Sequence, residues 1–246
     1  MDEALDAAPV VVDRATWQAA RDALLVREKA HTREGDAIAA ARRRLPMVEV
    51  DPALTVVGPR GPVPLREVFE GRAQLIAYYF MWGTGHPAPA QCEGCTFYTA
   101  HVRELSYLHA RDVTYATFCQ GPYDESVRYR DFMGWDTPWY SVLDSADALL
   151  AGRQVGRMHL VCYLRHGDRV FETYATTVRG VEAMDNSYAL LDLTVYGRQE
   201  PWEDSPAGWP QCFDLAGGEQ LRTDGRPTAQ WSRLRAGRSD DLRAPA

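Results

Sequence analysis

The sequence has little of what marks a nucleic-acid-binding or membrane protein. Its 27 Lys and Arg residues are outnumbered by 34 Asp and Glu residues, which gives a formal net charge of −7. An acidic chain offers no broad basic surface for phosphate groups. The longest apolar run, residues 75–82, is far shorter than the roughly 20 residues of a membrane-spanning helix. We therefore expect no nucleic-acid partner and no membrane insertion.

The chain also lacks the marks of a secreted, disulfide-bonded protein. Its start, MDEALDAAPVVVDR, has no basic segment followed by an apolar run. Cysteines are few and odd in number: Cys92, Cys95, Cys119, Cys162 and Cys212. An odd count without a signal peptide argues against a disulfide framework. We expect a cytoplasmic protein, in which a close cysteine pair indicates redox chemistry or metal binding.

Strands and helices are predicted to alternate along most of the chain. A helix is expected from Asp13, its N-cap, to Arg44. The strand 73–82 has apolar residues on both of its faces, as in a sheet buried on both faces. The other elements expected are strands at 47–50, 54–57, 112–119 and 138–144, a hairpin at 158–177, and helices at 65–71, 96–111, 123–134 and 181–193. This order predicts an α/β architecture with a central mixed sheet flanked by helices.

Composition divides the chain into three parts. Residues 1–46 form an N-terminal helical extension, and residues 47–215 hold the alternating strands and helices. Residues 216–246 contain few large apolar side chains, so we expect a polar tail that is partly disordered or wrapped on a partner. The long N-terminal helix makes a homodimer possible.

The motif C-E-G-C, residues 92–95, lies between the buried strand and the following helix. A cysteine at a helix N-terminus is close to unpaired backbone N–H groups and the positive end of the helix dipole, which favour the thiolate. The second cysteine, one turn later, can attack a mixed disulfide formed on the first. We therefore expect Cys92 to be the nucleophile and Cys95 the resolving thiol. Glu93 beside Cys92 should raise its pKa and oppose the dipole.

A metal site is the alternative for the same edge of the sheet. Cys119 ends a second strand and His159 begins the hairpin, so Cys92, Cys95, Cys119 and His159 could converge. Thiolate and imidazole ligands together suit zinc or copper. Cys162 and Cys212 are expected to be packing or surface thiols.

Seven sequence blocks resemble a bacterial family of unknown function whose members are usually described as predicted dithiol-disulfide oxidoreductases. The blocks are EKAHTREGDAIAAARRRLPMVEV, QLIAYYFMWG, CEGCTF, LHARDVTYA, MGWDTPWYS, DRVFETYATTVRG and YALLDLTVYGRQE, and the resemblance as a whole covers roughly residues 17–212. The resemblance implies a thioredoxin-like fold. This chain departs from the commoner pattern in a loop, GTGHPAPAQ, that adds His86 and looks longer than usual.

Three functions follow as hypotheses. The first is a thiol-disulfide oxidoreductase that acts on small-molecule or protein thiols and disulfides, with an external reductant. It requires no cofactor, and no G-x-G-x-x-G motif follows a strand to predict a flavin or nucleotide. The second is a copper- or zinc-binding protein that uses the cysteine and histidine ligands. The third is a non-enzymatic interaction protein that docks through its long helix and tail.

Overall fold

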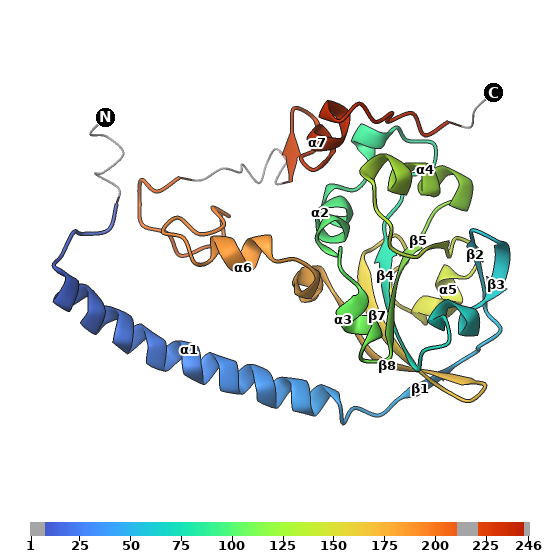
Figure 1. Cartoon of the computed structure of the whole chain (residues 1–246), viewed down its shortest axis with the longest axis horizontal. Coiled ribbons are helices and arrows are strands. Elements are labelled where there is room, and N and C mark those ends of the chain that lie inside the picture. The colour runs from blue at the N-terminus through green and yellow to red at the C-terminus, as the bar shows by residue number, and fades with distance from the viewer. Residues whose placement is uncertain (1–7, 211–220, 244–246) are drawn as a thin grey trace.

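An eight-stranded sheet forms the centre of the computed structural model, which describes residues 8–210 and 221–243 (Figure 1). The strand order is β1-β8-β7-β4-β5-β6-β2-β3. β4 pairs in parallel with β5, and β5 with β6, whereas β7 and β8 are antiparallel to their neighbours. The strands are β1 (Val48–Val50), β2 (Thr55–Gly58), β3 (Gly61–Pro64), β4 (Gln74–Phe80), β5 (Val113–Cys119), β6 (Trp139–Ser141), β7 (His159–His166) and β8 (Arg169–Thr177).

The strands β8-β7-β4-β5 form the core of a thioredoxin-like fold. A helix connects the parallel pair β4 and β5, and an antiparallel hairpin, β7 and β8, completes the sheet on the other side of β4. The predicted fold class is therefore confirmed. The predicted N-terminal helix is also present as α1 (Arg14–Arg42), with Asp13 as its N-cap.

Side chains of β4 alternate between two hydrophobic clusters, one on each face of the sheet. Leu75, Ala77 and Tyr79 point to the cluster covered by the 3-10 helix η1 (Leu65–Phe69) and by α5 (Ala146–Leu150). Tyr78 and Phe80 point to the opposite cluster. That cluster also contains side chains of α2 (Glu93–His101) and α4 (Tyr123–Met133). Burial on both faces explains why β4 reads as one continuous apolar run.

Two predicted helices are each divided into shorter pieces. The helix expected at 96–111 is interrupted at Val102, which is extended, and resumes as α3 (Ser106–His109). The helix expected at 181–193 is a 3-10 helix, η3 (Val178–Met184), followed by α6 (Ser187–Leu191). Extended backbone at Asp185 separates them. The helical pattern identified these segments but not their breaks.

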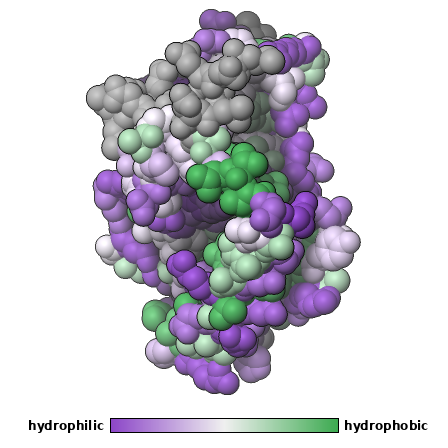
Figure 2. All heavy atoms as spheres, turned by 90° about the vertical axis from the view of Figure 1, so that its left-hand side faces the viewer, coloured by the Kyte–Doolittle hydropathy of each residue, from purple (hydrophilic) through white to green (hydrophobic). Residues whose placement is uncertain are grey.

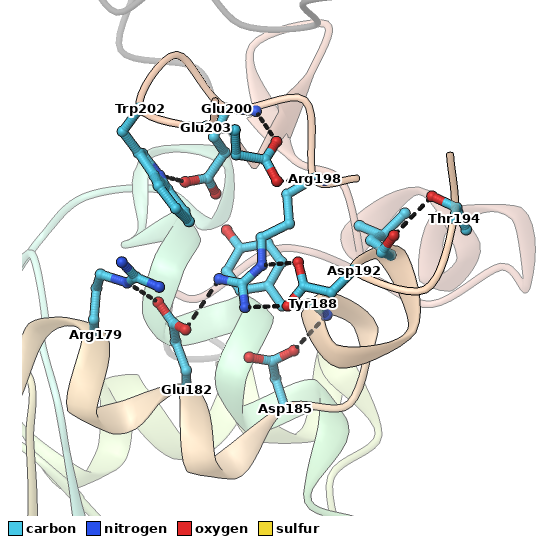
Figure 3. Close-up of polar contacts among 11 residues, drawn as sticks. Arg179, Glu182, Asp185, Tyr188, Asp192, Thr194, Arg198, Glu200, Trp202 and Glu203 are labelled. Atoms are coloured by element: carbon cyan, nitrogen blue, oxygen red, sulfur yellow. Dashed lines mark hydrogen bonds and ion pairs between the residues drawn. The ribbon is translucent and has the colours of Figure 1, made fainter. Parts of the chain in front are cut away.

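Arg198 holds together residues 178–203, the segment that follows β8 (Figure 3). Its guanidinium forms ion pairs with Glu182 and Asp192, at 3.0 and 2.7 Å, and lies 4.4 Å from the centre of the Tyr188 ring. Tyr188 in turn packs against Phe97 of α2, with the ring centres 5.0 Å apart. A buried arginine with two carboxylate partners thus holds this irregular segment against α2.

The C-terminal residues differ from the expected polar tail. Residues 221–243 form β9 (Arg222–Thr223), β10 (Arg226–Pro227) and α7 (Gln230–Arg235), which lie beside α2 and α4 (Figure 1). Gln230 is fully buried and donates to the Tyr129 hydroxyl and to the carbonyl of Ala88, both at 2.8 Å. A few anchoring residues therefore suffice to fold a segment of polar composition onto the domain.

The helix α1 contributes no buried residue and extends away from the sheet (Figure 1). Figure 2 views that side of the molecule and shows hydrophobic residues gathered on a largely hydrophilic face. Exposed apolar side chains at the start of the described chain include Val10, Val11, Val12 and Trp17. The homodimer stays a prediction. No helix among residues 8–210 and 221–243 is both long and apolar enough to cross a membrane.

Candidate redox site

Cys92 is the N-cap residue of α2, immediately beyond the loop that follows β4. The backbone N–H of Cys95 donates to the Cys92 sulfur at 3.4 Å. The sulfur thus takes the position that a serine or aspartate oxygen occupies at most helix N-termini. The sulfur of Met81 lies 3.9 Å away, on the loop side. A negative charge on Cys92 would be stabilised by N–H groups of the first helical turn.

Cys95 lies one turn further along α2 and is fully buried. Its sulfur accepts a hydrogen bond from the backbone N–H of Met81 at 3.3 Å. Cys92 is only partly buried, and both cysteines are free thiols. The motif therefore pairs one accessible thiol with one enclosed thiol.

The side chain of Gln91 fixes the loop before Cys92. Its oxygen accepts from the N–H of Gly83 at 3.0 Å, and its nitrogen donates to the carbonyls of Gly83 and His86, both at 2.9 Å. Gln91 is fully buried, so these three bonds replace water for both ends of the amide. The sequence interpretation missed this residue, although an amide directly before the motif was visible.

A second loop contact comes from Arg222, in the segment predicted to be a tail. Its guanidinium is ion-paired with Glu93 and donates to the carbonyls of Pro89 and Gln91, at 2.6 and 3.0 Å. The Arg222 side chain is 18% exposed and that of Glu93 22%. No signal in the sequence connected Arg222 to a motif about 130 residues earlier.

The two thiols have pKa values shifted in opposite directions. The hydrogen bond from the Cys95 thiol, together with the N–H groups of Cys95 and Gly94, lowers the pKa of Cys92 from 9.0 to about 7. Burial and the charge of Glu93 oppose this shift, as the sequence predicted for Glu93. Burial, followed by the interaction with Cys92, raises the pKa of Cys95 well above its ordinary value. At neutral pH the first thiol is therefore partly ionised, whereas the second is protonated.

A cleft of about 430 Å³ opens in front of Cys92. Its walls include Trp82 from the loop, Gln120 after β5 and Val155 from the segment before β7. Arg222 and Glu93 complete the lining. A volume of this size admits a small molecule or an extended side chain.

The structure does not bring the four predicted metal ligands together. His159 pairs with Tyr79 across β7 and β4, and their rings are 6.4 Å apart on the face opposite α2. Side chains alternate along a strand, so this register directs His159 away from Cys92 and Cys95. Within residues 8–210 and 221–243, no three His, Cys, Asp or Glu residues form a group that could hold a metal ion.

Cys119 lies on the same face as Cys95 but has a different environment. Its fully buried thiol interacts with the Ser126 hydroxyl of α4, and burial raises the pKa of Cys119 to about 12. A thiol with this pKa stays protonated at neutral pH, which disfavours it as a metal ligand.

His86 and Cys162 lie outside the cleft. His86 is exposed and lines a separate hollow beside α4. Cys162 is half-buried in β7, and burial raises its pKa to about 11. Cys212 lies outside the described residues.

Residues 6–215 match a family described as bacterial protein of unknown function, DUF899. The match spans most of the 246-residue chain. No curated protein sequence matches the chain.

Among solved structures, the chain is similar to peroxiredoxin Q from Xanthomonas campestris, with 15% identity and a TM-score of 0.42. That similarity covers 62% of this chain and 98% of the other. A peroxidoxin, BcpB, from Mycobacterium tuberculosis has 15% identity and a TM-score of 0.34, and the match covers 54% of this chain and 82% of the other. At these values the similarity does not extend to activity.

Proposed function

We propose that this chain, which belongs to the bacterial DUF899 family of unknown function, is a thiol-disulfide oxidoreductase in which Cys92 attacks and Cys95 resolves. The observation that carries the proposal is the asymmetry of the pair. The accessible thiol lines a cleft and has a pKa of about 7, whereas the enclosed thiol has a raised pKa. A thiol whose pKa is close to the ambient pH combines a substantial thiolate fraction with retained nucleophilicity.

The reaction begins at the cleft. The Cys92 thiolate attacks one sulfur of a small-molecule or protein disulfide, the substrate S–S bond breaks, and one substrate thiolate leaves and takes up a proton. Cys92 is now joined to the other half of the substrate. Cys92 is no longer a thiolate, so its contribution to the raised pKa of Cys95, which is second to that of burial, is removed.

Cys95 then resolves the mixed disulfide. It loses its proton and attacks the Cys92 sulfur, which releases the second substrate thiol and leaves a Cys92–Cys95 disulfide. One substrate disulfide has been reduced to two thiols, and the two protein thiols have been oxidised. An external dithiol reductant restores the pair.

Single serine variants test the proposal. Reduced Cys95→Ser protein should accumulate a mixed disulfide on Cys92, detected by intact mass, because the resolving thiol is missing. Cys92→Ser should reduce no disulfide. Cys162→Ser, which removes a half-buried thiol outside the cleft, is the matched control and should keep wild-type turnover. Wild-type rates in Cys92→Ser would refute the proposal.

A further inference from the structure

The cleft beside Cys92 has an unusual charge arrangement, which bears on its substrate. Besides Cys92 itself, only two of the described residues that line it are ionisable, Glu93 and Arg222. These two are ion-paired with each other. The other lining side chains, among them Met81, Trp82 and Val155, carry no charge. The cleft thus offers no free counter-charge to an incoming molecule.

Four of the five N–H donors of Arg222 are already in use. Besides the Glu93 contact, Nη1 donates to the carbonyls of Pro89 and Gly225, at 2.6 and 3.2 Å, and Nη2 to that of Gln91 at 3.0 Å. A substrate carboxylate could replace the charge partner of Arg222 only by displacing Glu93, which would leave a mostly buried carboxylate unpaired; otherwise it reaches at most one remaining N–H of a guanidinium whose charge is already compensated. Unpaired buried charges are costly, so this exchange is disfavoured.

A cationic substrate meets the converse difficulty. Glu93 is already ion-paired with Arg222, so its charge is compensated before the ligand arrives. Entering a mostly apolar cleft removes water from a charged group, and no opposite charge replaces it. Neutral molecules do not carry this penalty.

We infer that the Glu93–Arg222 pair makes this cleft selective for small, uncharged disulfides over anionic or cationic ones. The inference rests on the proposed function and narrows its substrate class. It also assigns the C-terminal segment a role, because Arg222 is supplied by β9. Removing either partner should expose the charge of the other and reverse the preference in a defined direction.

Three disulfides of matched size test the inference: bis(2-hydroxyethyl) disulfide, which is neutral, dithiodiglycolate, which is anionic, and cystamine, which is cationic. The rate of thiol release from each is measured with reduced protein at low ionic strength. Each rate is divided by that of the same disulfide with 2-mercaptoethanol, which corrects for intrinsic reactivity and for repulsion by a thiolate. Wild-type protein should prefer the neutral disulfide about tenfold over either charged one, an effect of the size that burial of a charge produces.

The variants separate charge from structure. Arg222→Met should shift the preference to cystamine, because Glu93 is left free. Glu93→Gln should shift it to dithiodiglycolate, because Arg222 is left free. The double variant shares the lost loop contacts of Arg222→Met but carries no charge, so it should prefer the neutral disulfide again.

Each result bears on one of the two proposals. The same corrected order of rates in all four proteins would overturn the inference while leaving disulfide reduction intact. Absence of reaction with every disulfide in the wild-type protein, or full reaction in Cys92→Ser, would refute the proposed function instead.

Discussion

Replacing Cys95 by alanine should raise the pKa of Cys92 without removing its thiol. The hydrogen bond from the Cys95 thiol is the largest cause of the lowered pKa of Cys92, ahead of the N–H groups of Cys95 and Gly94. The substitution removes that bond and keeps both N–H groups. Alanine differs from cysteine only by the missing sulfur atom, so the substitution leaves a small cavity at this fully buried position.

The size of the effect follows from the shift itself. Lowering the pKa from 9.0 to about 7 corresponds to about 3 kcal/mol of preference for the thiolate. If the thiol hydrogen bond accounts for about half of this preference, the pKa of Cys92 is near 8 in Cys95→Ala. The thiolate fraction at pH 7 then falls from about one half to about one tenth. Alkylation at pH 7 should slow about fivefold, and the two proteins should react alike above about pH 9.5.

The assay is iodoacetamide alkylation of reduced protein between pH 5 and 10, with the modified cysteine identified by peptide mass. Burial raises the pKa of Cys119 and Cys162, to about 12 and about 11, so both should stay unlabelled at neutral pH. Cys119→Ala, which removes another buried thiol on the same face of the sheet, is the matched control and should titrate like the wild type. A Cys92 midpoint that does not move in Cys95→Ala, or a wild-type midpoint near the ordinary value of about 8.5, would refute the reasoning.

Four further predictions concern the loop, the segment held by Arg198, the metal alternative and the pH dependence of stability. Gln91→Ala should lower the free energy of unfolding by about 1–3 kcal/mol in chemical denaturation, because buried backbone groups lose their partners; no change would show that water replaces the amide. Arg198→Met should increase cleavage by chymotrypsin within residues 178–203 of the folded protein, since Asp192 loses its partner and Glu182 keeps only Arg179; cleavage at the wild-type rate would contradict the role of Arg198 in holding this segment. Cys119→Ser and His159→Ala should leave zinc and copper content after metal loading unchanged, because neither residue joins the Cys92 cleft; loss of stoichiometric metal in either variant would restore the four-ligand site. The pKa of Cys92 is lowered by folding, so the stability of the reduced protein should rise between about pH 7 and pH 9 and be unaffected by this group below pH 7; a fall across that window would contradict the shift.

Local patterns were enough to predict the fold class and the position of the cysteine pair. The run at 73–82 places apolar side chains on both faces of the strand. Only a central strand, here β4, buries such a segment. Cys92 at the start of a helix follows from the helical pattern of the residues after it, and the N-cap contact with the Cys95 N–H confirms that start. The helix beginning at Asp13 is equally local, because its cap and its residues need no distant partner.

The four predicted metal ligands do not converge, because strand register is a tertiary property. His159 and Cys119 do lie at strand ends, as expected, but a shift of one residue exchanges the two faces of a sheet. Pairing with Tyr79 directs His159 to the face opposite α2. Periodicity within β7 cannot reveal which of its two faces meets α2.

Residues close together in the chain were sufficient to predict the order of strands and helices and the motif at the end of the central strand, because strand burial and helix capping are local properties. The surroundings of the thiols depend instead on contacts between segments that are far apart in the chain. Gln91 and Arg222 act on the loop through hydrogen bonds to backbone carbonyls, and such acceptors leave no trace in residue type. Arg222 pairs with Glu93 across about 130 residues, so the charge of the cleft emerges only when the C-terminal segment folds back onto α2.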